Sequence, residues 1–275
     1  MKLILSRKGL DSSKGEHRSP ILPDGRIYSL PIPTSNYAGG IPYERVQCGE
    51  DTAARILSDL GIDAGEKCHL DPDLRFETVE RSPGWRPLFG QLKGAQGHLR
   101  KQGVGTDDLF LFFGLFCETE KKDGCLQYVR GASPQHVLFG WMKVGEIVRG
   151  TESIRRYAKR NPWASDHPHV QIDEPQNTLY VARDREAGAF ETYHTDLRLT
   201  AAGEKGPKVW ALPSLFLPKG RPPLTYHKEA DFRLHDDQVR LESAAPGQEF
   251  VLDCDLYTEA LSWADELIAK HRTAQ

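Results

Sequence analysis

The sequence lacks the features that mark secreted, membrane-spanning and disulfide-stapled proteins. Its five cysteines form no CxxC pair, and their odd number does not suit a disulfide framework, so we expect reduced thiols. No stretch approaches the roughly 20 apolar residues of a membrane helix, and the longest apolar run, 109–117, has the length of a strand. The N-terminus shows no long apolar segment followed by a small-residue cleavage site. These absences predict a cytoplasmic protein with no membrane partner.

The chain also lacks a large excess of either charge. Its 36 basic and 39 acidic residues give a formal net charge of −3, which excludes a protein that coats nucleic acid by bulk charge but allows a local basic groove. With 275 residues, of which 39% are hydrophobic, the chain is long enough to bury a substantial core. We find no internal repeat, no low-complexity tract and no clean linker. We therefore expect one domain over residues 1–275.

Hydrophobic periodicity predicts an α+β fold. Apolar or alternating runs predict strands at 2–6, 109–117, 135–147, 178–182 and 208–213, and a hairpin-like turn at 235–238. Glycines within 135–147 favour a bend or bulge there. Helical spacing predicts helices at 51–60, in the second half of 87–102, at 151–159 and at 255–270, whereas 118–124 is expected to be a charged loop. The expected architecture is a compact domain with a mixed or barrel-like β core, flanking helices and long ordered loops.

The stretch from Ser6 to Ser13, SRKGLDSS, is the first candidate site. It follows a predicted strand and combines two cations, a glycine, an acid and hydroxyls, so backbone N–H groups and cations could converge on an anion. The P-loop and dinucleotide-binding glycine spacings are absent. Arg7 and Lys8 would hold a phosphate, while Asp11 could act as a base, a ribose acceptor or a metal ligand. A solvated N-terminal loop explains the same residues.

A second candidate is the segment His69-Leu70-Asp71-Pro72-Asp73. Carboxylates two residues apart in an extended segment point to the same side. With His69 they could bind a hard cation, orient a nucleophile or cap the next turn. A further segment, Asp166-His167-Pro168-His169, also suggests a metal, but its spacing matches no strong zinc pattern. We therefore assign no metal ligand and expect ordinary loop residues there.

Three further groups could contact a nucleotide. Gln91 could read a base edge, and aromatic residues such as Trp85, Phe113 and Trp141 could stack on a base, although strand aromatics usually belong to a core. Surface polarity explains Gln91 equally well. A short basic helix carries four clustered cations that could bind a nucleic-acid backbone: Arg155, Arg156, Lys159 and Arg160.

Several long segments resemble one known family. They include LSRKGLDSS, SPILPDGR and LPIP, then HLDPDL, FGQ with AQGHL, GVGTDDLFLFFGLF, HVLFGWMKVGEI, HPHV with NTLYVA, and WALPSLFLP. Together they resemble the third family of nucleotide-modification-associated domains, which occurs in bacteria and phages near genes that modify DNA bases. The resemblance covers most of residues 1–215. It implies a role in DNA base modification or phage defence, and it implies neither a particular reaction nor a particular cofactor.

A fainter likeness concerns the architecture. The paired strand patterns at 108–113 and 137–147 are similar to strands of PUA, ASCH, EVE and YTH barrels, which often bind modified bases or RNA. Fold likeness alone does not assign a function.

Three hypotheses follow from these features. In the first, which we favour, the protein is a nucleotide- or DNA-base-modifying enzyme. In the second, it is a non-catalytic reader that binds modified bases in DNA or RNA. In the third, it is a structural subunit among other proteins of a modification system, and no pocket joins the N-terminal loop to Asp71 and Asp73. For the enzyme, the expected catalytic residues are Asp11, Asp71 and Asp73, and the expected substrate-binding residues are Ser6, Arg7, Lys8, Ser12, Trp85, Gln91 and Phe113.

Overall fold

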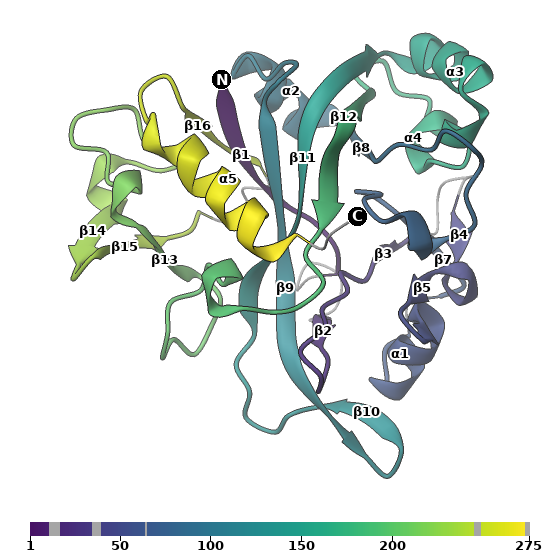
Figure 1. Ribbon diagram of the computed structural model, residues 1–275, viewed down its shortest axis with the longest axis horizontal. Helices are drawn as coiled ribbons and strands as arrows, with labels where there is room; N and C mark the ends of the chain where they lie inside the picture. The colour runs from purple at the N-terminus through teal and green to yellow at the C-terminus, as the bar shows by residue number, and fades with distance from the viewer. Residues whose placement is uncertain (11–16, 35–39, 64, 245–248, 273–275) are drawn as a thin grey trace.

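A curled mixed sheet forms the centre of the computed structural model, which describes residues 1–10, 17–34, 40–63, 65–244 and 249–272 (Figure 1). The main path of the sheet runs in the order β16 (Glu249–Asp253), β1 (Lys2–Arg7), β9 (Leu109–Lys122), β11 (Gln135–Arg149), β12 (Thr178–Ala189) and β8 (Leu88–Gln91). β1 and β9 are parallel, and the other neighbours along this path are antiparallel. The fold is therefore α+β with a mixed, partly barrel-like sheet, as the sequence predicts.

The curl of the sheet brings its two edge strands together. At the end of β8, the side-chain Nε2 of Gln91 donates a hydrogen bond of 2.6 Å to Oε1 of Glu249 at the start of β16. Inside the curl, the ring of Phe89 lies within 5.1–5.6 Å of the rings of Phe110, Phe112 and Tyr180. The interior of the curl is thus filled by aromatic packing.

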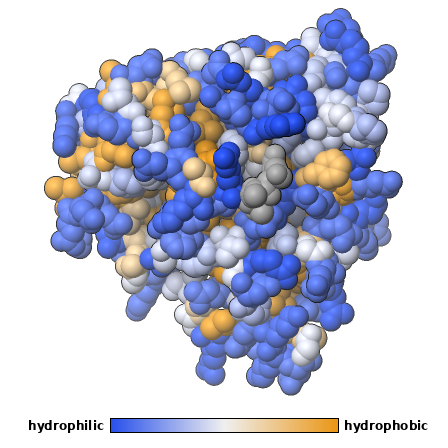
Figure 2. All heavy atoms as spheres, viewed as in Figure 1, coloured by the Kyte–Doolittle hydropathy of each residue, from blue (hydrophilic) through white to orange (hydrophobic). Residues whose placement is uncertain are grey.

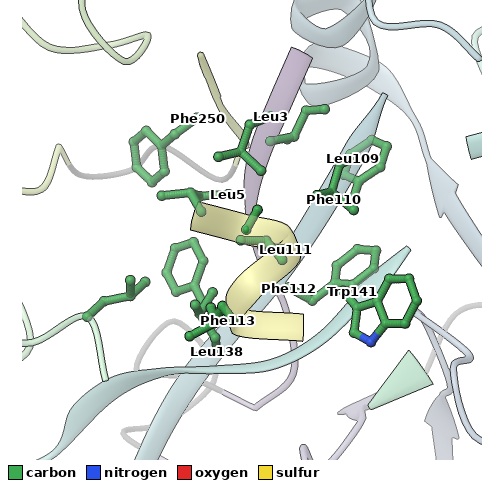
Figure 3. Close-up of a cluster of buried hydrophobic side chains, with 14 of the residues drawn as sticks. Leu3, Leu5, Leu109, Phe110, Leu111, Phe112, Phe113, Leu138, Trp141 and Phe250 are labelled. Carbon is green, nitrogen blue, oxygen red and sulfur yellow. The ribbon is translucent and has the colours of Figure 1, made fainter. Parts of the chain in front are cut away.

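β9 is apolar along most of its length because both of its faces are buried. Phe112 points into the curl toward Phe89, whereas Phe113 points to the opposite face and packs 5.1 Å from Trp210. Figure 3 shows these two residues within the main hydrophobic cluster, together with Leu3, Leu5 and Trp141. A strand covered on both faces reads as a continuous hydrophobic run, which is the pattern of residues 109–117.

The outer face of the sheet is covered by the C-terminal part of the chain. A small sheet of β13 (Val209–Pro213), β15 (Gln238–Glu242) and β14 (Phe232–His235) lies beside it, and α5 (Glu259–His271) runs across it (Figure 1). Ala260, Ala264, Leu267 and Ile268 of α5 belong to the main core. β14 and β15 form the hairpin that the sequence predicts around 235–238.

The N-terminal quarter of the chain packs around a second buried cluster, which includes Leu30, Tyr43, Ile56 and Cys68. Its short strands are β3 (Ile32–Pro33), β7 (Lys67–His69) and β4 (Ile41–Pro42) in one sheet, and β5 (Gln47–Cys48) and β6 (Asp51–Thr52) in another. The helix α1 (Ala53–Asp59) begins where Thr52 Oγ1 accepts from the Arg55 N–H, and Gly61 follows it at φ +67°. This helix is shorter than the predicted range 51–60.

Two further helices follow the predicted pattern closely, α2 (Lys93–Lys101) and α3 (Thr151–Arg160). The short helix α4 (Pro168–Gln171) and the strand β2 (Ser19–Ile21) lie where the sequence predicts neither helix nor strand. β11 carries the predicted irregularities, with register shifts between Leu138 and Gly140 and between Met142 and Glu146. None of the described helices is long and apolar enough to cross a membrane.

Several boundaries differ from the prediction, among them the end of β12, which runs to Ala189 instead of residue 182. The expected charged loop at 118–124 is mostly strand, because β9 continues to Lys122 and forms a hairpin with β10 (Cys125–Tyr128). The cross-strand ladder there overrides the polar composition, which is tolerated because the hairpin projects into solvent (Figure 1). The C-terminal helix begins at Glu259 instead of residue 255, since 254–256 form a turn after β16.

Candidate functional site

A buried carboxylate surrounded by three histidines is the most unusual feature of the structure. Asp71 follows β7, which ends at His69, whereas His167 and His169 lie at the start of α4. Asp71 Oδ2 lies 3.6 Å from His69 Nε2 and 3.5 Å from His169 Nε2, and Asp71 Oδ1 lies 3.4 Å from His167 Nε2. The side chain of Asp71 is only 6% exposed. Residues about 100 positions apart in the chain thus meet at one point.

The neighbouring strand β8 completes this centre. The backbone N–H of Gly90 donates a 2.8 Å hydrogen bond to Asp71 Oδ1. A Cβ atom at position 90 would lie 2.1 Å from Cδ2 of the His169 ring, so this position requires glycine for His169 to stand where it does. Gly90 therefore both binds the carboxylate and makes room for one of its histidines.

Asn177 fixes the orientation of His169. Its Nδ2 donates to the carbonyl oxygens of His169 and Ile172, at 2.7 and 3.2 Å, which identifies its Oδ1 as the atom facing the histidine ring. This Oδ1 lies 2.6 Å from Nδ1 of His169, so Nδ1 carries the proton. His167 shows the opposite arrangement, since its Nδ1 accepts from the His169 N–H at 3.3 Å.

The electrostatics of the centre favour an ionised carboxylate. Burial alone would raise the pKa of Asp71, but His167, His169 and His69 together hold it well below its usual range. Burial lowers the pKa of His167 despite the nearby carboxylate, so its ring is neutral at pH 7. The centre is thus a negatively charged group in a largely water-excluded position.

Asp73 does not belong to this centre, although it lies two residues from Asp71. Both terminal nitrogens of Arg81 donate to its carboxylate, and the Arg81 guanidinium stacks 4.3 Å from the centroid of the Trp85 ring. Burial raises the pKa of Asp73, and Arg81 opposes that shift. Asp73 is therefore held in a buried ion pair with Arg81. Trp85, the other predicted residue, packs against the guanidinium of that pair.

A cleft joins Asp71 to the N-terminal part of the chain. It contains about 560 Å³ of empty space, including its open mouth. Its lining includes Gly9, Tyr28 and Ser29 from the N-terminal part, together with Asp71 and Arg75. The predicted residues Asp11 and Ser12 lie outside the described residues, but Gly9, from the same stretch, contributes to the wall.

The side chains of Arg7 and Lys8 lie on opposite faces of the sheet. Lys8 Nζ binds Glu249 Oε1 at 2.7 Å and lies 4.8 Å from the centroid of Phe89, inside the curl. Arg7 pairs in register with Phe113 on the other face, where it helps burial to lower the pKa of His136. Alternation along a strand separates adjacent side chains, so these two cations do not form one phosphate clamp.

Lys8 and Gln91, predicted separately, meet at a residue that the sequence did not single out. Gln91 and Lys8 both donate to Oε1 of Glu249, which is 1% exposed. Ser6 stands opposite Glu249 in the β1–β16 register, and its side chain is buried. This polar network ties the two edges of the curled sheet together, and none of its four side chains lines the cleft.

The aromatic residues proposed for base stacking divide into two groups. Phe113 and Trp141 are buried in the main core, at 0% and 7% exposure, and neither lines the cleft at Asp71. Trp85 is half-buried and engaged by Arg81. Tyr28 instead lines the cleft, with the Arg75 guanidinium 4.7 Å from its ring centroid.

The basic helix α3 lies next to the centre in the fold. It packs on α4, which carries His169, through the buried cluster that contains Ile154, Tyr157 and Val170. Arg156, Lys159 and Arg160 are exposed, whereas Arg155 is half-buried and contacts Glu152 and Asp173. Figure 2 shows a largely hydrophilic surface at the corner where Figure 1 places α3.

Two groups of described side chains could hold a metal ion. The first is His69, Asp71 and His169, whose ligand atoms lie within 4.8 Å of one another. The second is His194, Asp196 and His271, but there Lys270 already binds Asp196, and His194 and Asp196 are exposed. Only the first group adjoins the cleft.

Sequence reasoning singled out Asp71 but missed most of its partners. The sequence predicts ordinary loop residues at His167 and His169, and it gives no local signal for Gly90 and Asn177. The signal that could have found them is their position, since HPHV, NTLYVA and FGQ are three of the segments that carry the family resemblance. Their convergence is a property of the fold, which no spacing along the chain reveals.

Comparison with known proteins identifies the family. The family model described as nucleotide modification associated domain 3 matches residues 2–253, so the chain belongs to this family. The family description ties the chain to nucleotide modification systems. Neither the curated proteins nor the solved structures gave a match, and the likeness to PUA-type barrels stays a prediction.

Proposed function

We propose that this protein is an enzyme that modifies a nucleotide, either free or within DNA, and that its chemistry takes place at Asp71. The observation that carries this proposal is a buried, histidine-surrounded carboxylate in the wall of an open cleft. Titratable groups with shifted pKa values that line a cleft are typical of active sites.

The two aspartates of the segment provide an internal comparison. Asp73 is paired with Arg81 through two hydrogen bonds, the arrangement expected of a structural ion pair. Asp71 Oδ2, in contrast, faces two imidazole nitrogens at 3.5 and 3.6 Å, which is too long for charge-assisted hydrogen bonds. Its environment is arranged for a proton transfer or for a bound group more than for stability.

The cleft offers chemistry that suits a nucleotide. Tyr28 lines it with a ring that the Arg75 guanidinium covers on one face, Gln47 and Ser29 offer hydrogen-bonding groups, and Gly9 lies among the lining residues. Aromatic rings stack on bases, and amide groups can read base edges. The cleft joins the N-terminal stretch to Asp71, whereas the hypothesis of a structural subunit expects no such pocket.

Of the two substrate forms, a free nucleotide and a nucleotide within DNA, we favour the second. Exposed cations on α3 lie beside the α4 helix that carries His169, so a backbone bound along α3 would bring a nucleotide close to the centre. Flanking cations would add an affinity for polymers that a free nucleotide does not gain. On this proposal the protein acts within a DNA modification or phage-defence system, with other proteins of that system as partners.

The test is a search for turnover. Wild type and Asp71→Asn are incubated with nucleotides and with normal or modified oligonucleotides, and the products are identified by mass spectrometry. Asp123→Asn is the matched control, because Asp123 lies in the remote β9–β10 turn at φ +51°, a conformation that asparagine tolerates well.

We expect a mass change with wild type and Asp123→Asn, and none with Asp71→Asn. Tight binding of a modified oligonucleotide by wild type without any product would overturn the enzyme proposal and support a reader instead. Equal turnover by all three proteins would exclude Asp71 from the chemistry.

A further inference from the structure

We propose that His69, Asp71 and His169 bind one divalent first-row transition-metal ion, Fe²⁺ or Zn²⁺, at the wall of the cleft. The inference deepens the proposed function, because it assigns a cofactor class to the same centre. It rests on the geometry and on the proton positions that the hydrogen-bond network imposes.

The proton positions give the strongest argument. Because Asn177 Oδ1 accepts the proton on His169 Nδ1, Nε2 is the nitrogen of that ring left to bind a metal ion. It faces Asp71 Oδ2 at 3.5 Å, which is too long for a charge-assisted hydrogen bond. A cation between the two atoms would bind both. A carboxamide or carboxylate that orients a ligating histidine through its other ring nitrogen is common at metal sites.

The two carboxylate oxygens of Asp71 have different surroundings. Oδ1 accepts from the Gly90 N–H at 2.8 Å and lies 3.4 Å from His167 Nε2, which carries a proton because Nδ1 of that ring is an acceptor. Oδ2 faces His69 and His169. The protein thus supplies donors to one oxygen and leaves the other directed at two imidazole nitrogens. His167 orients the carboxylate and is not a ligand.

The distances also suit an ion. Two ligands at about 2.1 Å from a tetrahedral ion stand about 3.4 Å apart, close to the 3.5 and 3.6 Å observed. The rings of His69 and His169 meet edge to face at 64°, with centroids 5.5 Å apart, so neither blocks the other's approach. Small movements of the side chains would complete the coordination.

The donor set indicates the class of metal. Two imidazoles and one carboxylate suit iron and zinc, whereas magnesium and calcium prefer oxygen ligands alone. Three protein ligands also leave coordination positions for water or substrate, as in catalytic sites. Since Asp71 lines the cleft, a ligand in the cleft can reach such a position.

Metal binding is measured directly, separately from turnover. The full chain is stripped with a chelator and titrated by calorimetry with Zn²⁺, with Co²⁺, and with Fe²⁺ under anaerobic conditions. Metal content after gel filtration is read by mass spectrometry, and the visible spectrum of the Co²⁺ form reports its coordination. We expect one ion per chain and a Co²⁺ spectrum that changes in His69→Ala.

Substitutions identify the ligands. His69→Ala and His169→Ala should each weaken binding by more than 100-fold, and Asn177→Leu by about 10- to 100-fold, the usual effect of removing a residue that orients a ligand. His194→Ala, from the exposed second group, is the matched control and should bind as wild type does. Circular dichroism establishes that each variant is folded, and His169→Gln replaces His169→Ala if the latter is not.

The outcomes separate the two proposals. The metal proposal is overturned if no ion binds in one-to-one ratio, if both ligand variants bind like wild type, or if turnover persists undiminished after the ion is removed. A protonated Nε2 on His169 at pH 7, seen by nitrogen NMR of the chelator-treated protein, would also overturn it, since the centre would then be an imidazolium–carboxylate pair. Stoichiometric binding without turnover would support the metal site and overturn the proposed enzyme.

Discussion

The glycine at position 90 should be indispensable for the candidate site, and Gly90→Ala tests this most simply. The new Cβ atom would lie 2.1 Å from Cδ2 of His169, whereas carbon atoms in contact stand about 3.5 Å apart, so the ring must move by about 1.4 Å. Nδ1 of the ring is held by Asn177, and movement breaks that bond. Overpacking costs about 1–3 kcal/mol and the broken buried hydrogen bond about 1–3 kcal/mol. We expect the free energy of unfolding to fall by about 2–6 kcal/mol.

Gly97→Ala is the control, because we expect it to raise the free energy of unfolding where Gly90→Ala lowers it. Gly97 lies inside α2, and the only atom near its added Cβ would be Gln176 Oε1 at 3.9 Å. Alanine is a better helix former there, so Gly97→Ala should stabilise the protein by about 0.5–1 kcal/mol. Urea unfolding followed by circular dichroism measures both changes. A Gly90→Ala protein as stable as wild type, with its affinity for Zn²⁺ unchanged, would refute the packing argument.

Three further predictions concern other parts of the molecule. Lys8→Met should cost about 3–5 kcal/mol of stability because it leaves Glu249 charged and buried, and adding Glu249→Gln should recover at least about 1 kcal/mol in a double-mutant cycle. Burial lowers the pKa of His136 to about 3, so this residue's contribution to stability is full above about pH 6.5 and is lost as the pH falls toward 3, at up to about 1.4 kcal/mol per pH unit. His136→Leu should flatten that part of a denaturation profile, and an unchanged slope would contradict the assignment. Three cations of α3 are exposed: Arg156, Lys159 and Arg160. Replacing all three by glutamine should weaken oligonucleotide binding and reduce the slope of log K against log salt concentration by about 2–3, without changing the unfolding midpoint.

The strands of the core could be predicted because their signal is local. The run at 109–117 and the alternating pattern at 135–147 each carry enough apolar residues to indicate a strand, and both lie in the central sheet. The end of β9 could not be predicted, because its polar residues pair with β10 and the cross-strand ladder decides their structure. The position of Lys8 beside Glu249 depends on the β1–β16 register, which joins residues about 240 positions apart.

Prediction from the sequence is even more limited at the candidate site, because pairs of residues with identical spacing have members with different roles. Asp71 and Asp73 stand two residues apart, as do His167 and His169, and sequence alone gives no reason to separate the members of either pair. The partners make the difference. Arg81 donates hydrogen bonds to the Asp73 carboxylate. Among the described residues, the Asp71 carboxylate accepts the Gly90 N–H and faces three imidazole rings.

Within the histidine pair, the main chain and Asn177 decide which nitrogen holds the proton. His167 accepts a backbone N–H through Nδ1 and so directs an N–H at Asp71. His169 donates its Nδ1–H to Asn177 and faces the same carboxylate with Nε2, the nitrogen left to bind an ion. One ring can then serve as a hydrogen-bond donor and the other as a ligand. It follows that Asn177→Asp should be tolerated poorly. A carboxylate can still accept from Nδ1, but it cannot donate to the carbonyl oxygens of His169 and Ile172, so the side chain loses the two bonds that orient it.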